Sequence, residues 1–203
     1  MKKYAVLHEP GDIVTLAGTR FVVLDVERRG SLPDSLFLLA LESVGASEFG
    51  SSNNYAESDL KKAVDKWLED MGKRGLDNAK LIPREIDLTT LDGSGCYGKL
   101  SVKAAPLTLD EAREYADIIP NAERWCWLAT GWSGPSKSDG DLALYGGSSG
   151  GWGGSYCSGS YGVRPALKIP SDLLLDSADK PDLSEVPTDT LLEEIRRRVV
   201  DKA

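Results

Sequence analysis

The sequence has few of the residues that metal sites, disulfide frameworks and hydrolytic triads require. It contains one histidine, His8, and three cysteines, Cys96, Cys126 and Cys157, with no CxxC spacing. Structural zinc usually needs four such ligands, and an odd number of cysteines cannot pair completely within one chain. A pair of nucleophile and base would depend on His8 alone. We therefore expect free thiols, no metal, no cofactor and no enzymatic activity.

An excess of positive charge and long apolar runs are also missing. Lys and Arg number 24 against 32 Asp and Glu, which gives a formal net charge of -8. A field of this sign repels phosphate backbones and anionic membrane surfaces. No apolar run is long enough for a membrane span, and His8 and Glu9 lie where a signal peptide would have its apolar core. We expect a protein made in the cytoplasm without a signal peptide, with no nucleic-acid partner and no membrane insertion.

Regular hydrophobic patterns predict strands and a helix in the first part of the chain. Three strands, at 12–16, 20–26 and 36–41, are separated by glycine and proline turns, which is typical of an antiparallel meander. Helical spacing of apolar residues then predicts a helix between the cap Ser58 and the stop Gly72.

A second helix is predicted from Leu109 to about Ile119. Thr108 and Glu111 stand in the capping-box arrangement, in which each side chain accepts a hydrogen bond from the other residue's backbone. Pro120 follows the helix, and a proline at this place favours its end there.

The composition changes sharply after Ala122. More than half of the residues from Gly131 to Gly162 are Gly or Ser, and five large aromatics interrupt them. Gly and Ser bury little surface against a large ordering entropy, so such a segment usually forms a flexible linker. Linkers seldom carry so many aromatics, and strand-like segments at 125–128 and 163–169 flank this one. We therefore predict a set of ordered loops, held at both ends.

Several segments, taken in chain order, resemble a domain family of bacteria and phages. The most specific is Gly162-Val163-Arg164-Pro165-Ala166, which follows the stretch rich in Gly, Ser and Tyr. That family is similar in turn to the C-type-lectin-fold variable proteins of diversity-generating retroelements, which include the phage major tropism determinant. The resemblance covers roughly Gly11 to Ile169. Its other segments are the strand pair of 11–26, Asn53 to Leu60 with Trp67-Leu68, Leu81-Ile82-Pro83, Pro106-Leu107-Thr108 and Trp125-Cys126-Trp127-Leu128.

The resemblance implies an α+β, C-type-lectin-like fold in which two helices flank small antiparallel sheets and long ordered Gly/Ser-rich loops present the ligand contacts. The first and last strands would lie side by side. This ligand-binding domain would span residues 1–170, and composition predicts an acidic linker at 171–187 and an amphipathic helix at 188–203. Calcium-dependent lectins use a Glu-Pro-Asn loop. Ile119-Pro120-Asn121 lacks the acid, so we expect calcium-independent binding.

The Gly/Ser-rich segment is the predicted ligand face. Tyr and Trp offer large contact areas with two torsions to immobilise, while Ser and Gly adapt to a partner. The predicted contacts are Trp132, Asp139, Asp141, Tyr145, Ser148, Ser149, Trp152, Ser155, Tyr156 and Ser158. An alternative is that half of these aromatics hold the loops to the core, as we expect of Trp125 and Trp127. We expect Arg164 to clamp loop carbonyls or an internal acid, although a ligand carboxylate is an alternative partner.

These residues favour a ligand-binding, receptor-recognition protein that contacts a cell-surface protein or glycan. It would be a variable protein of a retroelement or phage if its gene is diversified. The alternative is a structural virion or assembly component without a ligand of its own. In that case the C-terminal helix would dock to a second copy or to a virion partner. An enzyme that uses cysteine or carboxylate chemistry is a third, weaker class.

Overall fold

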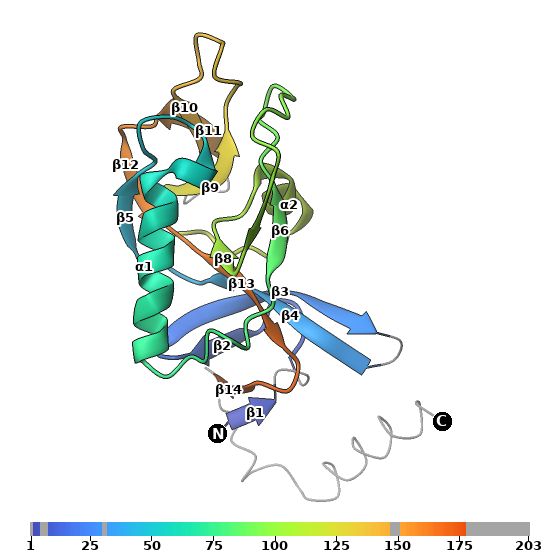
Figure 1. The fold of residues 1–203 in the computed structure, drawn as a ribbon. Coiled ribbons are helices and arrows are strands. Elements are labelled where there is room, and N and C mark those ends of the chain that lie inside the picture. The colour runs from blue at the N-terminus through green and yellow to red at the C-terminus, as the bar shows by residue number, and fades with distance from the viewer. Residues whose placement is uncertain (1, 5–7, 30–31, 147–150, 178–203) are drawn as a thin grey trace, which may run out of the picture.

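The computed structural model describes residues 2–4, 8–29, 32–146 and 151–177 and arranges them around three sheets (Figure 1). Sheet A has seven strands in the order β1 (Lys2–Tyr4), β14 (Leu174–Ser177), β2 (Ile13–Leu16), β3 (Thr19–Arg29), β4 (Leu32–Ala40), β13 (Ala166–Pro170) and β8 (Ala104–Ala105). Sheet B has five, in the order β11 (Trp152–Tyr156), β10 (Leu142–Gly146), β9 (Cys126–Gly131), β12 (Ser160–Val163) and β5 (Gly45–Glu48). Sheet C is the hairpin of β6 (Arg84–Asp87) and β7 (Lys99–Val102). The helices of these residues are η2 (Tyr55–Glu57), α1 (Asp59–Lys73) and α2 (Leu109–Glu114).

The expected α+β class, a C-type-lectin-like fold with two helices flanking small antiparallel sheets, is wrong. The described chain is mainly β, with about 39% of it in strands against 15% in helices. Sheet A alone has seven strands, and sheet B contains a parallel pair, β9 with β12. Two local features account for the difference: the second helix ends early, and the Gly/Ser-rich segment forms strands.

The second helix ends at Glu114 and not at Ile119. Its start is as predicted, since Thr108 Oγ1 accepts from Glu111 N at 3.2 Å and Glu111 Oε2 accepts from Thr108 N at 2.8 Å. Tyr115 then leaves the helical conformation, with φ -102° and ψ 17°, and its ring packs edge-on against Phe37 at 5.7 Å. Packing of Tyr115 on sheet A therefore overrides the helical periodicity.

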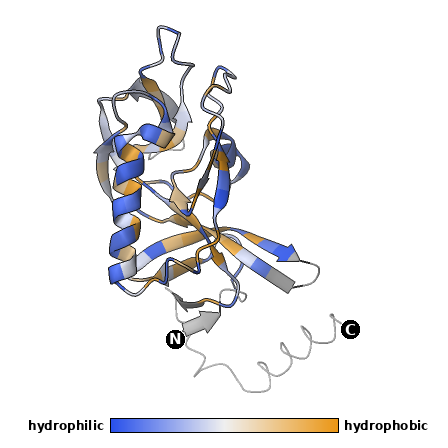
Figure 2. Cartoon of the chain, in the orientation of Figure 1, coloured by the Kyte–Doolittle hydropathy of each residue, from blue (hydrophilic) through white to orange (hydrophobic). Residues whose placement is uncertain are grey.

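The predicted meander is confirmed in the centre of sheet A, where β2, β3 and β4 pair antiparallel in sequence. Ala17 and Gly18 both have positive φ, 47° and 76°, as a two-residue turn that matches the twist of a hairpin requires. Neighbouring residues of β3 join different core clusters, Phe21 with α1 and Val22 with α2. The centre of sheet A is thus buried on both faces, which explains why the middle parts of β3 and β4 are apolar, whereas the outer end of this hairpin is hydrophilic (Figure 2).

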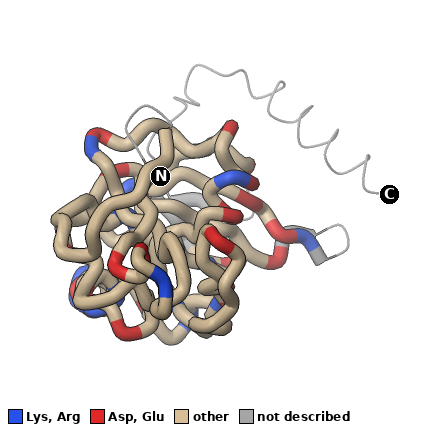
Figure 3. Tube along the Cα trace, turned by 90° about the horizontal axis from the view of Figure 1, so that it is seen from above, with Lys and Arg blue, Asp and Glu red and all other residues tan. Residues whose placement is uncertain are grey.

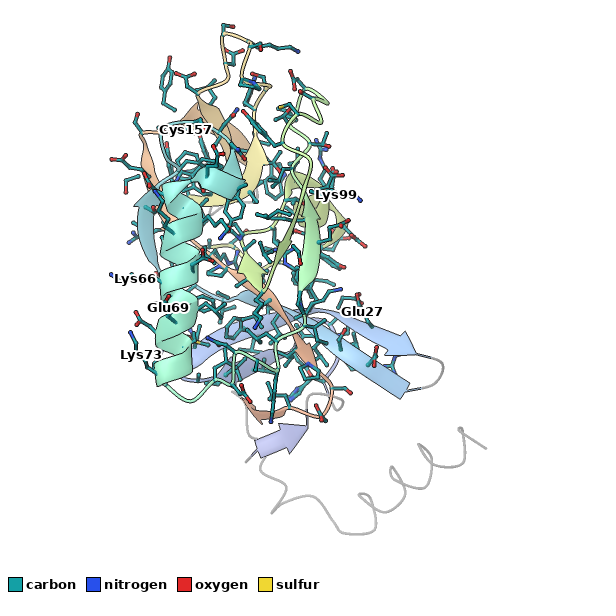
Figure 4. The ribbon with its side chains drawn as sticks, viewed as in Figure 1. Glu27, Lys66, Glu69, Lys73, Lys99 and Cys157 are labelled. Carbon is teal, nitrogen blue, oxygen red and sulfur yellow. The ribbon has the colours of Figure 1, made fainter. Side chains whose placement is uncertain are left out.

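Helix α1 begins at its predicted cap and packs on the core. Ser58 Oγ accepts a hydrogen bond from Lys61 N at 2.9 Å. The helix ends at Lys73, one residue beyond the predicted stop Gly72. Lys66 and Lys73 project from its outer side (Figure 4), which is hydrophilic in Figure 2. The buried side is made of Leu60, Val64, Trp67 and Met71.

The two ends of the described chain meet in sheet A, where β1 pairs antiparallel with β14 and β14 with β2. The last strand of the predicted domain of residues 1–170 is β13, and it pairs with β4 and β8, so the expectation that the first and last strands of that domain lie side by side is wrong. The predicted linker begins at residue 171, but residues 174–177 form β14. The rest of that linker and the helix at 188–203 lie outside the described residues. Neither described α-helix has the length and apolarity that crossing a bilayer requires.

Candidate functional site

The Gly/Ser-rich segment forms three strands of sheet B, β10, β11 and β12, and not the long loops predicted for it. Strands β10 and β11 pair antiparallel from Leu142↔Tyr156 to Gly146↔Trp152. Of the turn between them, residues 147–150 lie outside the described chain. The connections that remain are 132–141, between β9 and β10, and 157–159, between β11 and β12.

The glycines of these strands are seats for aromatic rings. A Cβ atom on Gly154 would lie 2.4 Å from Cε3 of Trp132, and one on Gly153 would lie 2.7 Å from Oη of Tyr145. A Cβ atom on Gly146 would lie 2.9 Å from Cζ3 of Trp152. Rings therefore fill the space that side chains would take, and their burial offsets the entropy that glycine loses in a strand. This explains physically why so glycine-rich a segment is ordered.

One face of sheet B carries a row of packed aromatic rings. Tyr145 stacks on Tyr161 with centroids 4.8 Å apart and an interplanar angle of 11°. The ring of Tyr161 packs edge-on against that of Trp127, with centroids 4.6 Å apart, and the ring of Trp125 packs edge-on against that of Tyr145, with centroids 4.9 Å apart. Trp127 is 1% exposed, so its predicted core role is confirmed. Trp125 is 38% exposed at the end of the row, so its predicted core role is wrong.

The opposite face of β11 presents two exposed rings. Trp152 is 44% exposed and Tyr156 is 64% exposed, and the alternation of a strand puts both on one side. Gly154 lies between them on that side, with the ring of Trp132 seated on it. We call Trp132, Trp152 and Tyr156 the β11 face. Three residues predicted as ligand contacts are thus brought together on one strand face.

The other predicted contacts fall into three groups. Asp139, Asp141 and Ser158 are exposed in the connections beyond the Tyr156 end of β11, where Cys157 N donates to Asp141 O at 2.7 Å. Tyr145 and Ser155 are half-buried on the aromatic-row side, and Ser155 Oγ accepts from Tyr161 Oη at 3.1 Å. Ser148 and Ser149 lie outside the described residues.

Asn53 ties the 132–141 connection to the rest of the molecule. It is 1% exposed, and its Nδ2 donates to Ser133 O at 2.8 Å and to Leu142 O at 3.0 Å. Its Oδ1 accepts from Tyr97 Oη at 2.6 Å. The sequence held no signal for this role, because the partners of Asn53 lie more than forty positions away.

A second tether joins the 132–141 connection to the 88–98 connection of sheet C, beside it at the top of Figure 1. Leu91 N donates to Gly131 O at 3.0 Å, and Asp92 N donates to Trp132 O at 3.2 Å. Lys137 Nζ donates to Asp92 Oδ2 at 2.5 Å. The hydrogen bonds of Lys137 and Thr90 lower the pKa of Asp92 to about 2.

This tether should survive mild acid. Because the pKa of Asp92 is lowered on folding, its contribution is present above the unfolded pKa of about 3.9 and is lost only as the pH falls through about 2. We expect the carboxyl carbon shift of Asp92 to titrate with a midpoint near 2 in NMR spectra. A midpoint near the unfolded value would contradict the Lys137 contact. Lys137→Ala should raise the midpoint only part of the way towards that value, because the hydrogen bonds of Thr90 and Ser94 N to Asp92 remain.

A pocket of about 140 Å³ lies behind Trp152, between the β11 side of sheet B and the segment after α2. Arg164, 7% exposed, lies in its wall and donates to three carbonyls, Ala40 O at 2.7 Å and Leu41 O and Pro120 O at 3.1 Å each. The prediction that Arg164 clamps loop carbonyls is therefore confirmed. The pocket itself was not predicted.

The thiols are free, as expected, and the two buried ones are poor nucleophiles. Cys96 is exposed, whereas Cys126 and Cys157 are buried. Burial raises the pKa of Cys126, and it raises that of Cys157, in the upper part of Figure 4, to about 12. Both are protonated at neutral pH, so the reactive thiolate is scarce. His8 is buried, and its Nδ1 lies 3.2 Å from Oδ2 of Asp12.

The part of the chain that the structure describes contains no group of three or more His, Cys, Asp and Glu side chains placed to hold a metal ion. No family model matches the chain, and no curated protein or solved structure matches it either.

Proposed function

We propose that this protein is a ligand-binding, receptor-recognition protein whose β11 face contacts a protein or glycan on a cell surface. The observation that carries the proposal is the exposure of Trp152 and Tyr156, 44% and 64%, on one side of a single strand. Exposed large aromatics are uncommon on a monomer surface and are over-represented among residues that dominate binding energy. Trp132 between them adds to one continuous aromatic surface.

Rigidity supports this proposal. The rings stand on paired strands, and the connection beside them is tied down by Asn53 and by the Asp92 tether. A surface held in its bound shape loses little entropy on association. Acidic and basic residues are interspersed around the molecule (Figure 3), so contact area and not a field of one sign would provide the affinity.

Removing both exposed rings should abolish recognition and leave the fold intact. Labelled protein would be applied to a glycan array and to intact bacterial cells of several strains. We expect Trp152→Ala with Tyr156→Ala to weaken any binding at least about tenfold, because hot-spot aromatics cost more than about 1.4 kcal/mol on truncation. The melting temperature should fall by only about 2–6 °C, because Trp152 loses its packing over Gly146, whereas the 64% exposed ring of Tyr156 contributes little burial.

The matched control is Lys66→Ala with Glu69→Ala, on the exposed side of α1. This pair should leave binding unchanged. Equal binding by wild type and the Trp152 and Tyr156 variant would contradict the proposal. A large loss of stability or assembly without loss of binding would indicate a structural component.

The resemblance to retroelement variable proteins extends the proposal to the gene. Codons for exposed positions such as Tyr156 and Ser158 would vary among copies, while the ring seats Gly153 and Gly154 would stay constant. Sequencing the gene in a population tests this, and identical copies without a template repeat would remove the extension.

A further inference from the structure

The pocket behind Trp152 has an apolar body. Leu39, Leu107 and Leu128, all buried, contribute to its lining, and Ile119 belongs to the segment that closes it from the other side. An apolar cavity of about 150 Å³ in another protein accommodates benzene. At about 140 Å³, this pocket has room for one six-membered ring or a branched aliphatic group of that size.

One wall of the pocket carries a charge that no carboxylate of the described residues balances. Arg164 is 7% exposed, and it donates hydrogen bonds to three backbone carbonyls. A guanidinium has five N–H donors, so two remain after those three bonds. Burial lowers the pKa of Arg164, yet a guanidinium stays charged at neutral pH. Buried charges are costly unless an opposite charge accompanies them.

The other buried arginine of the described chain shows the usual solution. Arg84 is 5% exposed and forms an ion pair with Glu111, besides donating to two carbonyls. Arg164 has the carbonyls but, within the described residues, no acid within 4.0 Å. The two buried arginines thus differ in two respects: Arg84 has an acid partner among the described residues, and Arg164 lines a pocket.

A second arginine, Arg124, lies near the pocket but does not line it. A Cβ atom on Gly162 would lie 2.7 Å from Sγ of Cys126, which lines the pocket, and 3.1 Å from Cδ of Arg124, an exposed residue. Arg124 forms no ion pair with any residue that the structure describes. Cys126 is a neutral thiol at pH 7, because burial raises its pKa. The charged residue in the wall of the pocket is therefore Arg164, and the positive charge of Arg124 lies outside the lining.

We infer that this pocket binds a small monocarboxylate, with the carboxylate against the free N–H groups of Arg164 and an apolar body of ring size against Leu128 and Leu107. Two N–H donors on one planar guanidinium match one carboxylate. The chain's net charge of -8 opposes polyanions, so one negative charge fits better than several. The inference goes beyond recognition at the β11 face, because it needs no macromolecular partner.

Benzoate is the probe, and benzyl alcohol is its matched neutral analogue. Each is titrated into the full chain and followed by ¹H–¹⁵N NMR. We expect benzoate to shift the amides of Cys126 and Leu128 and the Nε1 signal of Trp152, with at least about tenfold higher affinity than benzyl alcohol, which corresponds to about 1.4 kcal/mol. Equal affinity for the two probes would overturn the role of Arg164. Binding of neither would overturn the site.

A variant that fills the pocket keeps Arg164 and its three hydrogen bonds in place. Ala116 is exposed and lines the pocket, so Ala116→Phe should weaken benzoate binding at least about tenfold without a loss of melting temperature. Ala79→Phe, at an exposed alanine elsewhere, is the control. Unchanged benzoate binding by Ala116→Phe would overturn the location. Loss of cell or glycan binding by the β11-face variant tests the proposed function separately.

Discussion

Replacing Asn53 by alanine is expected to lower the free energy of unfolding by about 2–4 kcal/mol. The change leaves Ser133 O and Leu142 O without their donor and Tyr97 Oη without its acceptor. The carboxamide of Asn53 is 1% exposed, so water does not replace those bonds without opening the structure. Urea unfolding followed by circular dichroism measures the change.

The same substitution should release the 132–141 connection in the folded protein. Amide exchange at Ser133 and Leu142 should accelerate more than exchange in sheet A. Asn121→Ala, at an exposed asparagine, is the control and should change stability by less than about 0.5 kcal/mol. If Asn53→Ala and Asn121→Ala change the free energy of unfolding and the amide exchange equally, Asn53 does not anchor the 132–141 connection.

Adding one methyl group at Gly154 is expected to destabilise the protein by about 1–3 kcal/mol. The new Cβ atom would lie 2.4 Å from Cε3 of Trp132, a ring that packs against the core of Leu128 and Leu144. The ring cannot move away without losing those contacts. Gly154→Ala should also lower the affinity of the β11 face, because Trp132 lies between its two exposed rings. Urea unfolding measures the loss of stability, and tryptophan fluorescence measures the loss of affinity.

Gly45→Ala is the matched control, because Gly45 also lies in a strand of sheet B but has no atom within 4 Å of the position of an added Cβ. This variant should be neutral or slightly more stable, since alanine restricts the unfolded chain. Equal destabilisation by Gly154→Ala and Gly45→Ala would show that the ring of Trp132 does not pack over Gly154.

Local signals predicted the first half of the fold well. The meander follows from apolar strands separated by turn residues, and α1 follows from helical spacing after the cap Ser58. The capping box of Thr108 and Glu111 is also as predicted. The end of α2 was not, because the contact of Tyr115 with Phe37 is a tertiary one that helical periodicity does not contain.

The strands of the Gly/Ser-rich segment could not be predicted from local sequence patterns. Its order was predicted from the aromatics, but its strands were not, because glycine and serine have low strand propensity. The stabilising contacts join residues far apart in sequence, as between Gly154 and Trp132. Without the register of β10 and β11, no pattern shows that Trp152 and Tyr156 face one way and Tyr145 the other.

The pocket was missed for a related reason. Arg164 was noticed and its clamping role predicted, but its partners Ala40, Leu41 and Pro120 come from two distant segments. Only their convergence closes a cavity against Trp152. A cavity is a property of tertiary packing, and no single segment of the chain encodes it.

Hydrogen exchange of the backbone amides between residues 131 and 162 is the most direct test of the recognition surface. If aromatic rings seated on glycines hold β10, β11 and β12 in place, the hydrogen-bonded amides of these strands should be protected to nearly the same degree as those of β3 and β4 in sheet A. Exchange at the rate of an unstructured chain throughout 131–162, with sheet A still protected, would mean that Trp152 and Tyr156 have no fixed arrangement to offer a partner.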